Sequence, residues 1–126
     1  MTKIGIFFFR TLYSQSASSV TVEKISSELK DNGIATEVRL LKQFDHFYNY
    51  EAFSTALEQD MIIYKTNFQD FEYGIRFLKN IYLKKNIPII LIGPFACLNK
   101  KRILKKYDFK IGCSNIGFDN VYYKSL

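Results

Sequence analysis

One segment decides the fold of this chain: residues 87–96, which read IPIILIGPFA. Its apolar run stops abruptly at Gly93-Pro94 and is typical of a central strand in a parallel sheet, buried on both faces. Ligands of open α/β sheets bind beyond the carboxyl ends of the strands, so Gly93 to Ala96 is the first candidate binding surface. Gly93 allows a ligand or another backbone to come close, and the alternative is only a tight turn from strand to helix.

Length and composition predict a single folded domain over residues 1–126. The chain is 48% hydrophobic and contains 12 Phe and 9 Tyr, which excludes a disordered chain. No apolar run approaches the roughly 20 residues of a membrane span, and the amino terminus does not resemble a secretory signal. Cys97 and Cys113 form neither a CxxC pair nor a disulfide framework. We therefore expect a soluble cytoplasmic protein that does not bind a membrane.

The net charge of +6 is concentrated in the second half of the chain. Basic residues cluster at positions 84–85, 100–102 and 105–106. Such a patch attracts phosphate or an acidic partner, or it serves only as a solvated face that keeps the protein in solution. No nucleic-acid-binding motif accompanies these residues, so nucleic acid is not an expected partner.

Apolar strand patterns alternate with helical patterns along the rest of the chain. Besides the strand that ends at Ile92, strands are predicted at residues 3–9, 35–41, 61–64 and 108–112. Helices are predicted from about residue 18 to 31, around residues 52–57, from Asn67 to Tyr82 and from Asn99 to Lys106. The remaining residues, 113–126, are too few for a full closing helix, so we expect this last helix to be short or missing.

This alternation predicts an α/β fold with right-handed crossovers and a five-stranded, mainly parallel sheet. The usual strand order for so small a chain is 2-1-3-4-5, with helices on both faces, as in flavodoxin-like folds. That order brings together the carboxyl ends of the first, third and fourth strands. The loops expected to converge there are residues 10–19, 65–67, 93–97 and 113–115.

The sequence contains no catalytic constellation. The only histidine, His46, lies among aromatic residues, where surface or packing roles are more common than catalysis, and with two distant cysteines it makes a poor metal-ligand set. Cys97 and Cys113 follow neighbouring predicted strands, which leaves a thiol role open. A phosphoacceptor receiver domain needs carboxylates after the first and third strands, where this chain reads FFRT and YKTN. We expect no catalytic residue, no metal site and no activity of the chain on its own.

A hydroxyl-rich loop after the first strand indicates a possible flavin site. Thr11, Ser14 and Ser16 precede a helix start, where a phosphate is favoured electrostatically. The loop resembles the flavodoxin phosphate loop in position and hydroxyl content, although it lacks glycine. FMN is therefore an alternative cofactor, and the competing interpretation is a polar loop with a good helix cap.

From Ser18 to Gly112 the chain resembles the cobalamin-binding domain that precedes the catalytic domain in many radical S-adenosylmethionine enzymes. The matching pieces are residues 28–38, which read ELKDNGIATEV, residues 59–66, residues 90–96 and residues 107–112. In that family the ends of the third, fourth and fifth strands surround the nucleotide tail and the corrin edge. The resemblance thus implies a cobalamin site formed by Thr66, Gly93, Pro94 and Gly112. Asn67 and Phe95, in the same predicted loops, are further candidate cofactor-binding residues.

The chain departs from that family at several motifs. The family's Gly-Gly-Pro-His is Gly93-Pro94-Phe95 here, and its Gly-Glu is Gly112-Cys113. The Asp-x-His-x-x-Gly signature is absent, as is a CxxxCxxC motif for an iron-sulfur cluster. The resemblance therefore implies a domain without radical chemistry of its own.

Three functions follow as expectations. The first is a cobalamin-binding-like domain that serves as a non-catalytic accessory or cofactor carrier for a partner radical S-adenosylmethionine enzyme. The second is a flavodoxin-like FMN-binding redox protein. The third is a cofactor-free interaction module, which binds a partner enzyme or a second copy through its carboxyl-terminal region, where Phe118, Val121, Tyr122 and Tyr123 lie.

Overall fold

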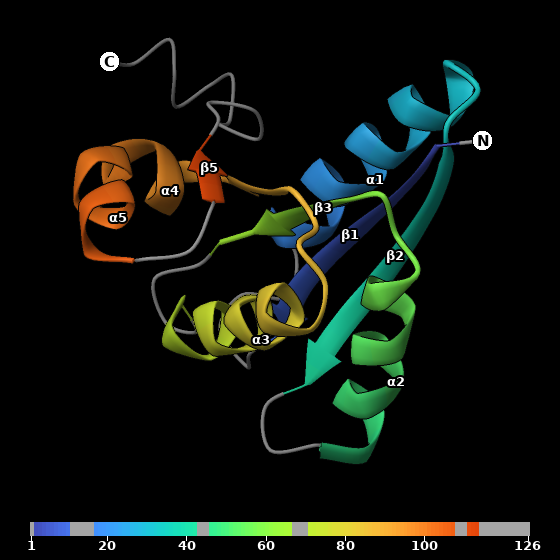
Figure 1. Cartoon of the computed structure of the whole chain (residues 1–126). Helices are drawn as coiled ribbons and strands as arrows, with labels where there is room; N and C mark the ends of the chain where they lie inside the picture. The colour runs from blue at the N-terminus through green and yellow to red at the C-terminus, as the bar shows by residue number, and fades with distance from the viewer. Residues whose placement is uncertain (1, 11–16, 43–45, 67–70, 108–110, 114–126) are drawn as a thin grey trace, which may run out of the picture.

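The computed structural model of the chain describes residues 2–10, 17–42, 46–66, 71–107 and 111–113 (Figure 1). Within this part, strands alternate with helices. The strands are β1 (Lys3–Arg10), β2 (Ala35–Lys42), β3 (Met61–Lys65), β4 (Ile89–Ile92) and β5 (Ile111–Cys113). The helices are α1 (Ala17–Asp31), α2 (His46–Leu57), α3 (Phe71–Lys84), α4 (Pro94–Leu98) and α5 (Lys100–Lys106).

The strands form one parallel sheet in the order β2-β1-β3-β4-β5. β1 pairs with β2 along its whole length, from Lys3 opposite Ala35 to Arg10 opposite Lys42. β3 lies between β1 and β4, and the short β5 pairs with β4 at the far edge. The structure thus confirms the predicted α/β class, the parallel sheet and the strand order, which is that of a flavodoxin-like fold.

Helices cover both faces of the sheet, and each face has its own apolar core (Figure 1). On one face α2 and α3 pack against the sheet, joined by Ala96 of α4 and Ile103 of α5. On the opposite face α1 packs through Val22. Side chains alternate between the faces of a strand, so Ile6 belongs to the α1 side and its neighbour Phe7 to the α2–α3 side.

A glycine sets the distance between α3 and the sheet. Tyr64 of β3 is the largest fully buried side chain, and a Cβ on Gly74 would overlap its ring and hydroxyl. Ile75 and Leu78 continue the buried stripe of α3 on the same side. The absence of a side chain at Gly74 therefore lets Tyr64 fit beneath the helix.

Side-chain hydrogen bonds secure two strand ends. Asn49 of α2 accepts from the Lys42 N–H at 3.0 Å and donates to the Lys42 carbonyl at 2.8 Å, at the end of the edge strand β2. The Asp60 carboxylate accepts from the Lys3 N–H at 2.7 Å, and the Asp60 N–H donates to the Lys3 carbonyl at 2.8 Å. These bonds satisfy backbone groups where the sheet ladder begins or ends.

Several boundaries differ from the sequence-based expectation. α2 begins at His46 rather than near Ala52, so much of the predicted aromatic connection is helical. Residues 94–98 form α4, because Pro94 has the fixed φ that suits the first helical position. Asn99 precedes α5 as predicted, yet its side chain makes no capping bond and its Nδ2 instead donates to the Phe95 carbonyl at 2.9 Å. The fifth strand is described over Ile111–Cys113, one residue beyond the predicted end, and the predicted residues 108–110 lie outside the described part of the chain.

Two further expectations concern residues outside the described part of the chain. These are Asn67 as the cap of α3 and a short or missing helix within residues 114–126.

Candidate functional site

The ends of β3 and β4 are joined by the side chain of Thr66, which is 1% exposed. Its Oγ1 donates to the Ile92 carbonyl at 2.7 Å and accepts from the Ala96 N–H at 3.1 Å. The Thr66 N–H donates to the same Ile92 carbonyl at 2.9 Å. We call Lys65, Thr66, Gly93 and Ala96 the carboxyl rim. Thr66 positions this rim by holding the start of α4 against the end of β3.

Gly93 makes the turn between β4 and α4 possible. Its φ of 100° lies in the region that residues with a Cβ rarely adopt. A Cβ there would also lie 3.1 Å from the Thr66 carbonyl oxygen and 3.3 Å from the Thr66 Oγ1. The sequence allows either a ligand or another backbone segment to come close to Gly93. In the structure the backbone of Thr66 comes close to it.

A buried lysine ends β3, and the sequence analysis did not single it out. Lys65 is 5% exposed and pairs in register with Phe8 of β1 and Ile92 of β4. Its Cδ lies 3.6 Å from the position of a Cβ on Gly93, so the side chain extends toward the end of β4. The available sequence signal was a lysine directly after the apolar run of residues 61–64.

Phe95 and Pro94 both belong to α4, the helix that leaves the carboxyl rim. The Phe95 ring lies 4.6 Å from the ring of Phe71, measured between centroids, at the start of α3. Aromatic pairs at this distance stabilise packing, so Phe95 joins α4 to α3. Its side chain is only partly buried beside the core, and the ring of Phe71 is one of its contacts there.

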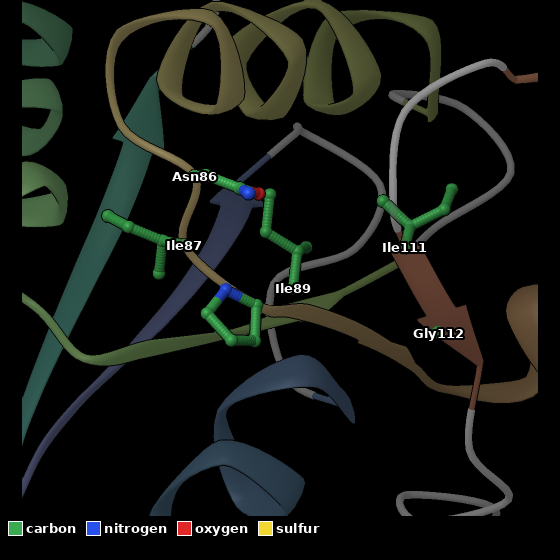
Figure 2. A pocket seen from close by; sticks show the side chains of 6 residues that line it. Asn86, Ile87, Ile89, Ile111 and Gly112 are labelled. Carbon is green, nitrogen blue, oxygen red and sulfur yellow. The ribbon is translucent and has the colours of Figure 1, made fainter.

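Gly112 lies away from the other described candidate residues. It pairs with Ile90, two residues before the end of β4, so it lies further from the carboxyl edge than Gly93 does. Figure 2 shows it beside a pocket at the opposite end of these strands. The pocket has a volume of about 460 Å³ and is lined by Asn86, Ile87, Pro88, Ile89, Ile111 and Gly112. Its lining is mostly apolar, so it offers contacts for apolar groups and few for a phosphate.

The remaining candidates, Thr11, Ser14, Ser16 and Asn67, lie outside the described residues. The structure therefore brings together Thr66, Gly93 and the first residues of α4. It places Gly112 away from these residues, and it adds Lys65 to the candidate residues of the carboxyl rim. The reason is the register: Gly112 pairs with the middle of β4, whereas Lys65 pairs with its last residue.

The basic helix α5 ends in a small polar cluster. The Tyr107 hydroxyl donates to Glu72 Oε1 at 3.4 Å, and the Lys106 Nζ lies 3.8 Å from the same oxygen. Burial raises the pKa of Tyr107, and the nearby Glu72 carboxylate raises it further. The Lys106–Glu72 pair is well exposed, so it adds little to stability. This cluster links α5 to α3 and does not form part of the carboxyl rim.

Over the described ranges, no three His, Cys, Asp or Glu side chains gather in a way that could hold a metal ion. In the same part of the chain, no helix combines the length and apolar character needed to cross a membrane.

In comparisons with known proteins, no protein-family model matches the chain and no curated protein sequence is significantly similar to it.

Proposed function

We propose that the chain binds cobalamin at its carboxyl rim and acts as a non-catalytic carrier or accessory for a partner radical S-adenosylmethionine enzyme. The observation that carries this proposal is the junction of β3 and β4, where Thr66 and Gly93 hold the strand ends together. The sequence resemblance places the cofactor beside this junction. In open α/β sheets ligands bind at this end of the strands.

The described residues are compatible with the phosphate-bearing tail of such a cofactor. Lys65 supplies an ammonium group at the end of β3, and the Gly93 turn brings the end of β4 close to Thr66 and to the Lys65 side chain. A bound corrinoid would supply the cobalt-centred chemistry. The residues of this chain would bind and orient it.

FMN is the second candidate cofactor, and the strand order favours it. In the order β2-β1-β3-β4-β5 all strands stay parallel but the strand order reverses between β1 and β3, and a ligand crevice forms at such a point. The loop with Thr11, Ser14 and Ser16 follows β1 directly. An FMN phosphate would bind beside this loop.

An interaction module is the third candidate. Leu98 of α4 and Leu104 of α5 are 64% and 43% exposed, next to the edge of the sheet formed by β5. Exposed apolar side chains near an edge strand favour contact with another protein. The partner in this case would be an enzyme or a second copy of the chain.

Retention of cofactor tests these proposals. Purified protein is incubated with hydroxocobalamin or with FMN, desalted, and examined by absorption spectroscopy. We expect the red absorbance of the corrinoid to be retained in stoichiometric amount. The variant Ser16→Glu, which adds a negative charge to the hydroxyl-rich loop that follows β1 in the sequence, should lose most of it. The variant Ser54→Glu, on the exposed side of α2, is the matched control and should retain it.

Retention of FMN alone would replace cobalamin by flavin as the cofactor. Loss of both colours would contradict both cofactor proposals, and a measured dimer or complex would then support the interaction module. Equal retention by Ser16→Glu and Ser54→Glu would contradict a role of the hydroxyl-rich loop in binding the cofactor.

A further inference from the structure

We infer that Lys65 binds the phosphate group of the cofactor, an inference that rests on the proposed function for the identity of the ligand. Both candidate cofactors carry such a group, as a phosphodiester in the nucleotide tail of cobalamin and as a phosphate monoester in FMN. The shared chemistry is therefore a phosphate oxygen bound to an ammonium group at the end of β3.

The burial of Lys65 is the first observation behind this inference. Among the lysines and arginines whose side chains the structure describes, Lys65 alone is buried. Removing an ammonium group from water costs free energy unless hydrogen-bond acceptors or a negative charge compensate it. Lys65 has interactions within the protein, and an ammonium group with three donors can add phosphate oxygens to them.

The position of Lys65 is the second observation. It is the last residue of the central strand β3, and its side chain extends toward Gly93 at the end of β4. Thr66 points to α4, so the alternation of the strand directs Lys65 to the opposite face, where Phe8 and Ile92 also lie. Its side chain is therefore placed at the carboxyl edge, on the α1 face of the sheet.

The third observation concerns the start of α1, within the part of the chain that the structure describes. β1, which pairs with β3, leads into the hydroxyl-rich loop of residues 11–16. The first turn of α1 contains no acidic residue. A phosphate near Lys65 would thus meet no carboxylate from the start of α1. The reversal of the strand order between β1 and β3, where Phe8 pairs with Lys65, lies at this same place.

The experiment compares ligands that differ in the phosphate group. Equilibrium dialysis measures binding of FMN against riboflavin, and of hydroxocobalamin against cobinamide, which lacks the nucleotide tail. The variants are Lys65→Met, which keeps the length of the side chain and removes its charge, and Lys101→Met, an equal change at an exposed site on α5. In parallel, thermal unfolding is followed in sodium phosphate and in sodium chloride of equal ionic strength.

We expect Lys65→Met to bind the phosphate-bearing member of the pair about 10- to 100-fold more weakly than the unmodified chain. Its binding of the phosphate-free member should be unchanged. Lys101→Met should behave like the unmodified chain in every assay. Phosphate should raise the unfolding temperature of the unmodified chain above its value in chloride, and Lys65→Met should lose this difference.

Each outcome separates the two claims. If the unmodified chain prefers phosphate-bearing ligands and Lys65→Met keeps that preference, the role of Lys65 is overturned while the proposed function stands. If no cofactor binds, the proposed function fails, and the stabilisation by phosphate alone decides whether Lys65 binds an anion. Should Lys65→Met not fold, Lys65→Arg replaces it. That variant keeps the charge and must retain both the ligand preference and the phosphate effect.

Discussion

Gly33, Gly93 and Gly112 differ in the two features that make a glycine necessary. Gly33 has a φ of 77°, and a Cβ there would meet nothing within 4 Å. Gly93 has a φ of 100°, and its Cβ would approach the Thr66 carbonyl oxygen. A Cβ on Gly112 would meet only ordinary contacts, the nearest at 3.9 Å from the Ile89 carbonyl oxygen. A comparison of the three positions thus separates the free-energy cost of a positive φ from that of the close contact with Thr66.

Alanine substitutions at these positions should reduce the free energy of unfolding to different extents. Gly112→Ala should change it by less than about 0.5 kcal/mol. Gly33→Ala should cost about 1 kcal/mol because of the backbone angle alone. Gly93→Ala should cost about 2–4 kcal/mol, because the contact with Thr66 adds to the strain. Urea unfolding at constant temperature measures all three. Equal costs at Gly33 and Gly93 would show that the contact with Thr66 contributes nothing.

Among the elements, α3 depends on one helical glycine. An alanine in place of a helix-interior glycine usually stabilises a protein by roughly 0.5–1 kcal/mol, because glycine loses more backbone freedom on folding. At Gly74 the packing against Tyr64 opposes this gain, since there is no room for a Cβ.

Gly74→Ala should therefore destabilise the protein, by about 1–3 kcal/mol, although alanine is the better helix former. Urea unfolding measures the effect. In the background Tyr64→Leu, which removes the overlapping ring atoms, the same substitution should cost less or become stabilising. A stabilising Gly74→Ala in the unmodified chain would contradict the close packing of α3 on β3.

In the whole molecule, protection of the backbone should follow the order of the strands. β1 and β3 are paired on both sides, whereas β5 pairs over three residues at one edge. Amide groups in strands that open only by global unfolding exchange most slowly. Hydrogen exchange followed by mass spectrometry should therefore show slow exchange in β1 and β3 and fast exchange in β5. Protection of β5 equal to that of β3 would contradict this arrangement.

Much of this architecture could be predicted from local patterns. The apolar run before Gly93 predicted β4, a strand paired on both sides, and the spacing of Ile75 and Leu78 predicted α3. Boundaries were less accurate where local signals conflict. The start of α2 at His46 was not predicted, because a segment rich in aromatic residues carries no clear helical period. In the structure this helix packs against β2.

The candidate site could be predicted only in part. A glycine followed by proline after an apolar run identified Gly93, because both residues have distinctive backbone preferences. Lys65 carries no such signal: its burial results from Phe8, Ile92 and Gly93, which lie far from it in the chain. The position of Gly112 required the register between β4 and β5, and residues 108–112 alone do not specify that register.

The amino-acid order alone therefore predicts the alternation of strands and helices and the parallel α/β class. It also predicts the turn at Gly93. All three features depend on residues that are close together in the chain. The folded arrangement was needed to show that the Thr66 hydroxyl bonds to Ile92 and Ala96, that Lys65 is buried, and that Gly112 lies beside a pocket away from the carboxyl rim. The physical reason is that hydrogen bonds between groups 26 and 30 residues apart, and the burial of a charge, form only when separate elements pack together.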